Sequence, residues 1–163
     1  MSKPVEVRFI WSKEAALKGS KLYYDWDMKH SSKRYVGWFF VALVQFAIVG
    51  ALKHHVFGLL YLSTFLLIYW YYIRWYIRKR MIVRYYDQSR IEEKEVLFTL
   101  TDEGLSYEDM MADWDHIFKA IKFDDGILLQ TLNYTLFFEK DAFKSPKEMD
   151  RFVEMMKQHG KLI

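Results

Sequence analysis

The sequence contains no cysteine among its 163 residues. This absence excludes a disulfide framework, zinc sites with thiolate ligands and cysteine nucleophiles. The chain also lacks GxSxG and HExxH motifs, a glycine-rich phosphate loop and a dinucleotide-binding fingerprint. We therefore expect a protein that is not an enzyme, with no catalytic residue, no metal site and no cofactor.

Charge is missing from two long stretches of the first half. Tyr35–Leu52 and Val56–Ile73 each contain 18 residues without a charged side chain. At about 1.5 Å per residue each stretch gives roughly 27 Å of helix, close to the ~30 Å hydrocarbon core of a bilayer. The remaining chain is too short to cover two helices that are apolar on every side. The sequence predicts a transmembrane hairpin with spans at 35–52 and 56–77.

Positive charge flanks the outer ends of both predicted spans, whereas their connection carries only Lys53. Cytoplasmic segments are enriched in Lys and Arg, so we expect both termini to be cytoplasmic. Six of these cations should face anionic lipid headgroups. We call them the cationic collar: Lys29, Lys33, Arg34, Arg78, Lys79 and Arg80.

The segment Lys53-His54-His55 separates the two apolar stretches. A protein metal site normally needs three or four ligands, and neither an acid nor a cysteine accompanies the two histidines. A short connection is usual between antiparallel helices. The segment is therefore interpreted as the tip of the hairpin.

One polar group stands out within the predicted spans. Gln45 precedes the tip by about the same number of residues as Ser63 and Thr64 follow it. These side chains should lie at similar depth, where an interhelical hydrogen bond contributes roughly 0.5–2 kcal/mol. The small residues Ala47 and Ala51 would allow the helices to approach closely. We predict an intramembrane contact of Gln45 with Ser63 and Thr64.

The second half of the sequence has the alternating pattern of strands. Residues 95–108 form a predicted hairpin about the turn Asp102-Glu103-Gly104. His116–Phe123 and Ile127–Leu132 flank an Asp-Gly turn signal and form a second one. Tyr134–Glu139 gives a further strand. We expect a twisted antiparallel sheet.

Both ends of the chain carry elements that should pack on this sheet. A final helix is indicated by Ser145 as N-cap, Pro146 in the first turn, Glu148 completing a capping box and Gly160 beyond the last turn. At the other end, Val5–Ile10 alternates as a strand, and Ser12 can cap the helix that follows. Only the carboxy-terminal domain offers a sheet for that strand to join.

The predicted fold class is an α+β membrane protein in which a two-helix transmembrane hairpin is combined with an antiparallel β-sheet domain and one C-terminal helix. The expected divisions are 1–34, 35–90 and 91–163. Residues 1–80 have a net charge of +9 and residues 81–163 of −6. The acidic second half argues against nucleic acid as a partner. Its acids include Glu92, Glu93, Glu95, Glu108, Asp109, Asp113 and Asp115.

Two features of the second half were weighed as sites. Asp113, Asp115 and His116 could begin a site for a hard metal. A turn entering a strand, with Trp114 packed on the core, explains the same residues more simply. The pairs Met110-Met111 and Met155-Met156 are interpreted as packing residues rather than as cofactor contacts.

The order of these segments resembles the YcxB-like family of small bacterial membrane proteins. The resemblance rests on the two apolar stretches followed by VLFTLTDEGLSYE, DWDHIFKAIKFDDGILL and FEKDAFKSPKEMDRFVEMM. It implies a soluble domain similar to pleckstrin-homology (PH) domains and a multi-pass position in the bacterial cytoplasmic (inner) membrane. It implies no established activity.

The expected function is that of a membrane-anchored, non-enzymatic binding module with a cytoplasmic PH-like domain. An immunity-type protein that neutralises a bacterial toxin is the alternative, and an oligomeric transporter or channel component is a lesser one. The expected partners are the lipid bilayer and a protein of unknown identity, with oligomerisation left open. A neighbouring toxin gene would favour the immunity function.

Overall fold

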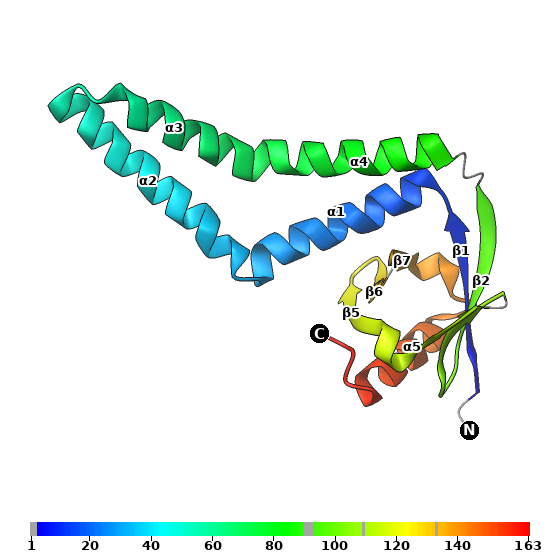
Figure 1. Cartoon of the computed structure of the whole chain (residues 1–163). Helices are drawn as coiled ribbons and strands as arrows, with labels where there is room; N and C mark the ends of the chain where they lie inside the picture. Colours follow the sequence, from blue (N-terminus) through cyan, green and yellow to red (C-terminus); the bar gives the residue numbers. More distant parts are fainter. Residues whose placement is uncertain (1–2, 90–92, 109, 133) are drawn as a thin grey trace. The chain divides into compact units, whose positions relative to one another are not determined.

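The computed structural model is an α+β fold with two antiparallel sheets, and it describes residues 3–89, 93–108, 110–132 and 134–163 (Figure 1). The chain divides into two compact units. The first, here called the sheet unit, contains Met1–Tyr23 and Tyr86–Ile163. The second, the helical unit, contains Tyr24–Tyr85. This division groups residues 1–23 with the sheets, whereas the sequence analysis placed them in a segment of their own.

The first strand of the chain joins the sheet unit, as predicted. Strand β1 (Val5–Trp11) pairs antiparallel with β2 (Lys94–Leu100) along its whole length. The sheet continues through β3 (Gly104–Tyr107) to β4 (Met110–Asp113) in the order β1-β2-β3-β4. The hairpin about Asp102-Glu103-Gly104 is confirmed, but β4 was not anticipated, because the sequence MMAD does not alternate between apolar and polar residues.

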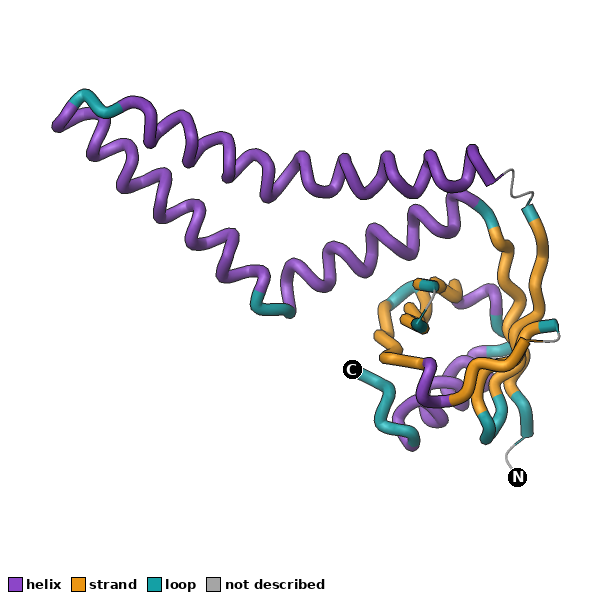
Figure 2. The backbone as a smooth tube through the Cα atoms, viewed as in Figure 1, coloured by secondary structure: helices purple, strands orange, loops and turns teal. Residues whose placement is uncertain are grey.

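The remaining strands form a second sheet, so the expectation of a single sheet was wrong (Figure 2). It contains β5 (Ile117–Phe123), β6 (Gly126–Thr131) and β7 (Thr135–Glu139). The short 3₁₀ turn η2 (Trp114–His116) ends β4 before β5 begins. Trp114 Nε1 donates a hydrogen bond to the Asp102 carbonyl at 2.9 Å, and the Trp114 ring packs against the core, as predicted. This turn redirects the chain from one sheet to the other.

Helix α5 (Pro146–Gln158) covers the core between the two sheets. The Glu148 amide donates to Ser145 Oγ, which confirms the N-cap, although Glu148 Oε2 is buried without a hydrogen-bond partner among the described residues. At the other end, Gly160 adopts φ +67° and the Lys161 amide donates to the Met156 carbonyl at 2.8 Å. A left-handed residue with this bond is the helix stop that glycine favours.

Aromatic rings fill the centre of the sheet unit. Phe138 is fully buried, with its ring centroid 5.7 Å from that of Phe9, 5.5 Å from Phe98 and 5.9 Å from Phe152. Most of these contacts are edge-to-face, the geometry that the ring quadrupole favours. The core therefore joins residues of β1, β2, β7 and α5.

The second sheet is buried on both faces. Residues Gly126–Leu129 of β6 are all buried, and so are three consecutive residues of β7. Helix α1 (Lys13–His30) begins after Ser12, whose Oγ accepts from the Ala15 amide as predicted. Gly19 approaches the backbone of β7, and the Lys18 ammonium lies over the Phe137 ring at 5.3 Å. The first turns of α1 thus cover the outer face of this sheet.

The helical unit is built around an antiparallel helix pair (Figure 1). Helices α2 (Lys33–His54) and α3 (Phe57–Ile68) meet at a two-residue connection, where His55 adopts the left-handed conformation with φ 55°. A turn between two helices therefore lies where the tip was predicted. Ala47, Ala51 and Ser63 are buried in the unit, so small residues let the helices approach.

The second apolar stretch does not form one uniform α-helix. After α3 the chain passes through the π-helical segment η1 (Tyr69–Ile73) into α4 (Arg74–Ser89). A π turn accommodates one extra residue, and here two consecutive residues, Trp70 and Tyr71, both reach Gly37 of α2. By length and composition, α2 is the single helix in the described part of the chain that could cross a membrane.

Candidate functional site

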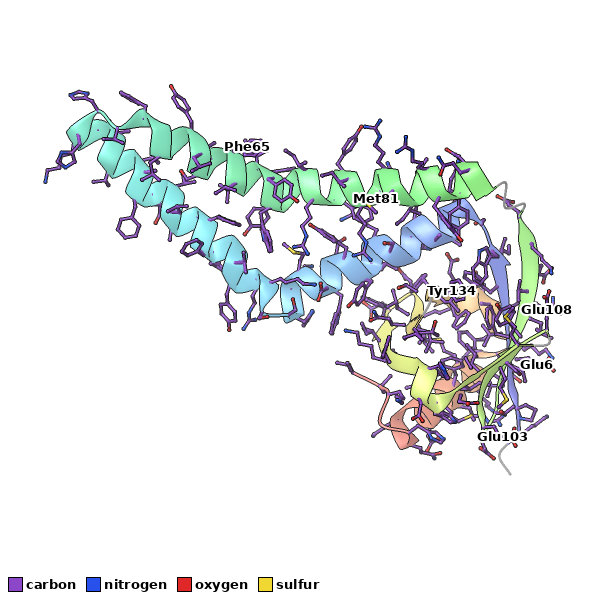
Figure 3. The ribbon with its side chains drawn as sticks, viewed as in Figure 1. Glu6, Phe65, Met81, Glu103, Glu108 and Tyr134 are labelled. Atoms are coloured by element: carbon purple, nitrogen blue, oxygen red, sulfur yellow. The ribbon has the colours of Figure 1, made fainter. Side chains whose placement is uncertain are left out.

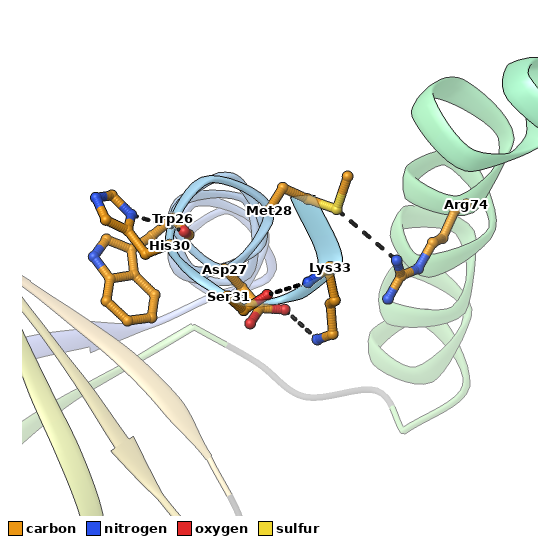
Figure 4. A network of polar contacts seen from close by, with 7 residues as sticks. All are labelled: Trp26, Asp27, Met28, His30, Ser31, Lys33 and Arg74. Atoms are coloured by element: carbon orange, nitrogen blue, oxygen red, sulfur yellow. Dashed lines mark hydrogen bonds and ion pairs between the residues drawn. The ribbon is translucent and has the colours of Figure 1, made fainter. Parts of the chain in front are cut away.

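A cluster of polar and aromatic side chains lies at the end of the helical unit away from the tip (Figure 4). It forms where α1 ends, α2 begins and η1 passes into α4. We call this cluster the junction site and define it by Tyr24, Asp27, Lys33, Trp70 and Arg74. The Ser31 amide donates to the Asp27 carbonyl and the Lys33 amide to Ser31 Oγ, so one backbone bond and one bond to the Ser31 side chain hold the turn between α1 and α2.

The acid of the junction site is Asp27, which is buried. Its carboxylate accepts a hydrogen bond from the Lys33 ammonium across the turn between the two helices. Removing water from a carboxylate is costly unless an opposite charge accompanies it. The pair therefore links the last turn of α1 to the first residue of α2.

Arg74 brings a positive charge to the aromatic side of the junction site. Its guanidinium lies 4.5 Å from the centroid of the Trp70 ring and 5.8 Å from that of Tyr24. Its Nη1 also lies 3.9 Å from Met28 Sδ. Burial raises the pKa of the Tyr24 hydroxyl, while the Arg74 charge acts in the opposite direction. The electron-rich faces of aromatic rings attract a cation, so the rings of Trp70 and Tyr24 both stabilise the Arg74 guanidinium.

Asp27, Tyr24 and Trp70 are site residues that no motif in the sequence indicates. The spacing of Trp70 and Arg74, four residues apart on a helix, was the available signal for their contact. No local pattern predicts the approach of Tyr24 to Arg74, because residues far apart in the sequence form it.

The six cations of the cationic collar differ in their contacts and in their exposure. Lys33 turns toward Asp27, and Arg34 donates to the hydroxyl of Tyr35 at 2.7 Å. Arg78 is half-buried. The three remaining cations are exposed: Lys29, Lys79 and Arg80. The collar thus contributes to internal contacts as well as to the surface.

The predicted contact of Gln45 with Ser63 and Thr64 is wrong. Gln45 is exposed, whereas Ser63 is fully buried and donates to the Leu60 carbonyl of its own helix at 3.1 Å. The reason is helical phase. Two residues correspond to about 200° of rotation, so burial of Ala47 in the seam turns Gln45 away from α3.

The histidines at the tip are exposed. Among the described residues, no three His, Asp or Glu side chains are grouped closely enough to hold a metal ion. Asp113, Asp115 and His116 instead lie where β4 passes through η2 into β5.

A second feature is an apolar pocket of about 260 Å³ in the sheet unit. Met110 and Met111 of β4 contribute to it with 62% and 47% of their surfaces exposed, so their interpretation as packing residues was wrong, whereas Met155 and Met156 are buried as expected. The lining residues are Phe98, Leu105, Tyr107, Met110, Met111, Ala112, His116, Thr131, Leu132, Tyr134 and Leu136.

Tyr107 and Tyr134 supply the polar groups of two of these walls. The Tyr107 hydroxyl donates to Met110 Sδ at 3.0 Å, and burial raises its pKa, with the neighbouring Tyr134 acting in the same direction. Tyr134 is partly exposed (Figure 3). The raised pKa keeps the Tyr107 phenol neutral at physiological pH, and the Tyr134 hydroxyl adds a second hydrogen-bonding group to a mainly apolar lining.

The chain around the pocket is strongly acidic. Between Thr101 and Ile117 the sequence has six Asp or Glu residues and neither Lys nor Arg. Glu108 pairs with Lys94 of β2, whereas Glu103, Asp113 and Asp115 are exposed. Of the acids named in the sequence analysis, Glu92 and Asp109 lie outside the described residues. An apolar pocket beside an acidic segment favours a ligand that combines apolar and basic groups.

Comparison with known proteins gives no relative: no protein-family profile, no curated protein and no solved structure matches the chain.

Proposed function

We propose that this chain is a membrane-anchored, non-enzymatic interaction module whose sheet unit is cytoplasmic and PH-like. The observation that carries the proposal is the exposure of large apolar side chains on α2 and α3. Leu52, Phe46 and Tyr61 expose 79%, 73% and 72% of their surfaces, and Phe65 is exposed as well (Figure 3). Contiguous apolar surface of this extent is unfavourable in water and favourable in lipid.

The second crossing would use α3 together with η1. These segments hold 12 and 5 residues and follow each other directly, without a charged side chain before Arg74. At about 1.5 Å per residue they give roughly 25 Å of helix, which a bilayer accommodates with slight thinning. All backbone groups remain within a helix, as a lipid environment requires.

Charge and aromatic residues support the orientation with both termini in the cytoplasm. Lys29, Lys79 and Arg80 are exposed near the outer ends of the two apolar stretches, and only Lys53 lies at the tip beside the histidines. The exposed rings of Tyr35, Trp38, Tyr72 and Tyr76 lie near the same outer ends. This distribution follows the positive-inside rule and the aromatic belt of membrane proteins.

The sheet arrangement supports the PH-like part of the proposal. Four strands in one antiparallel sheet, three in another and a capped C-terminal helix are compatible with the PH-like domain that the resemblance to the YcxB-like family implies. The helical unit lies between β1 and β2 in the chain, so the membrane hairpin would be an insertion in the first connection of the domain.

The apolar pocket is the surface that we assign to a protein partner. Its occupant is proposed to be a segment with an apolar side chain flanked by Lys or Arg, because the walls are apolar and residues 101–117 are acidic. Exposed methionines suit such contacts, since their flexible side chains adapt to different partners.

The anchoring is tested with single cysteines, which the natural chain lacks. In intact cells, an impermeant thiol reagent added outside should label His55→Cys and leave Ser145→Cys unlabelled until the membrane is opened. Both variants should stay in the membrane fraction after alkaline extraction. Release of the chain by alkali, or labelling of both positions from outside, would contradict the proposal.

The partner site is tested with a synthetic peptide in which three apolar residues lie between pairs of lysines. Its binding to the full chain in mild detergent should be weakened by Met111→Lys, which adds a like charge and blocks the pocket. Phe118→Lys is the matched control, because Phe118 is equally exposed on β5 but does not line the pocket. If both variants weakened peptide binding equally, the peptide would be attracted by the net charge of the chain and not by the pocket.

A further inference from the structure

Gln45 is the polar residue of α2 that its own hairpin leaves unsatisfied. Its side chain is exposed, and among the described residues no hydrogen bond reaches its amide. The neighbouring exposed side chains are apolar and large, with Phe46 and Val49 beside it. If α2 crosses the bilayer as proposed, this amide lies near the middle of the hydrocarbon core.

An amide at that depth needs a hydrogen-bond partner, and a second glutamine amide can be that partner. Its NH₂ group has two donors and its carbonyl accepts, so two glutamines can satisfy each other reciprocally. An unpaired amide in hydrocarbon costs several kcal/mol, because no water is available there. Ser63 does not supply the partner, since it is fully buried while Gln45 is exposed, and its hydroxyl donates to the Leu60 carbonyl of its own helix.

The residues on the same face of α2 have the spacing of a helix-packing seam. Trp38, Val41, Gln45, Ile48 and Leu52 follow one another at intervals of three, four, three and four residues. This spacing keeps one stripe of a helix against another helix. Gln45 occupies the centre of the stripe, and the seam with α3 uses other residues, Ala47 and Ala51.

We propose that two copies of the chain associate in the membrane through this stripe of α2, with reciprocal hydrogen bonds between their Gln45 amides. This inference rests on the proposed membrane hairpin. A second copy has the same topology and therefore carries its Gln45 at the same depth. A central polar residue in an apolar seam also specifies register, because only one alignment pairs the two amides.

The test uses disulfide crosslinking in vesicles of phosphatidylcholine and phosphatidylglycerol at high lipid excess. Leu52→Cys places a thiol on the stripe, and Leu62→Cys places one on the exposed face of α3 as the matched control. Mild oxidation should give a covalent dimer with Leu52→Cys and little with Leu62→Cys. Adding Gln45→Leu should lower the dimer yield of Leu52→Cys roughly tenfold at limiting protein, and Gln45→Asn should restore most of it.

The two proposals fail in different ways. A chain that is removed from the vesicles by alkali would contradict the membrane hairpin itself. A chain that resists extraction but crosslinks equally at both positions, or is unaffected by Gln45→Leu, would overturn the Gln45 association alone. Failure of Leu52→Cys to crosslink in a chain that resists extraction would also overturn it, and would direct attention to a different protein as the partner of Gln45.

Discussion

Val5 of β1 lies directly opposite Leu100 of β2, although the whole helical unit lies between them in the chain. Both residues are fully buried, and the ladder continues to Trp11 opposite Lys94. The first sheet therefore forms only when β1, which precedes the helical unit in the chain, pairs with β2, which follows it. Folding of the sheet unit depends on residues that precede the proposed hairpin.

Substitutions in β1 should destabilise the sheet unit strongly at buried positions and only slightly at exposed ones. Val7→Asp would place an unpaired charge in the core and should cost more than about 3 kcal/mol. Arg8→Asp is its control, because Arg8 is exposed on the same strand and should change stability by about 0.5 kcal/mol or less. Pulse proteolysis of the full chain in urea and mild detergent would measure both. Similar values for the two variants would contradict the pairing of β1 with β2.

The aromatic centre gives a second prediction. Phe138→Ala removes a fully buried ring that contacts Phe9, Phe98 and Phe152, and we expect a loss of about 3–5 kcal/mol. Phe118→Ala changes the same residue type where 53% of the surface is exposed, and it should have little effect. Thermal unfolding followed by near-ultraviolet circular dichroism would compare them. A small effect of Phe138→Ala on stability would contradict the central position of Phe138 in the core.

The ion pair between Asp27 and Lys33 should be measurable in a double-mutant cycle. The Asp27 side chain is 12% exposed, so its coupling to Lys33 should reach roughly 1–2 kcal/mol in Asp27→Asn and Lys33→Met variants. The exposed pair of Lys13 and Asp87, with an N–O distance of 2.9 Å, should give less than about 1 kcal/mol. Unfolding of the full chain in detergent supplies the energies. Equal coupling energies for the two pairs would contradict the burial of Asp27, because water would then screen its charge as it does that of Asp87.

A pH titration tests the contact between β1 and the segment before α5. The hydrogen bond and the charge of Lys144 lower the pKa of the Glu6 carboxyl, with smaller contributions in the same direction from Arg8 and Lys3. Because the folded pKa lies below the unfolded one, the stabilisation from ionised Glu6 is present above the unfolded pKa and lost as pH falls through the folded pKa.

Lys144→Met should therefore raise the pKa of Glu6 toward its ordinary value, as measured by NMR of the Glu6 carboxyl carbon. Lys147→Met removes the charge of an exposed lysine three residues further along the chain, which is not among the groups that lower the pKa of Glu6, and should leave that pKa nearly unchanged. The same upward shift in both variants would mean that general charge, rather than the Lys144 contact, lowers the pKa.

Local patterns in the sequence determined most of the individual elements. Alternation predicted β1, β2 and β3, the Asp-Gly signal predicted the hairpin of β5 and β6, and Ser145 with Gly160 predicted the limits of α5. These features are encoded locally, because a cap or a two-residue turn is decided by neighbours in the chain. That β1 joins the strands of the carboxy-terminal half followed as well, since only that half offered strands to pair with.

Tertiary structure alone decided how these elements combine. The separation into two sheets depends on the turn at Trp114, and the exposure of Met110 and Met111 depends on β4 being the last strand of its sheet. Matched depth suggested that Gln45 would meet Ser63, but burial of Ala47 set the rotation of α2 and turned the amide outward. Depth follows from counting residues, whereas rotation follows from which side chains pack best against the neighbouring helix.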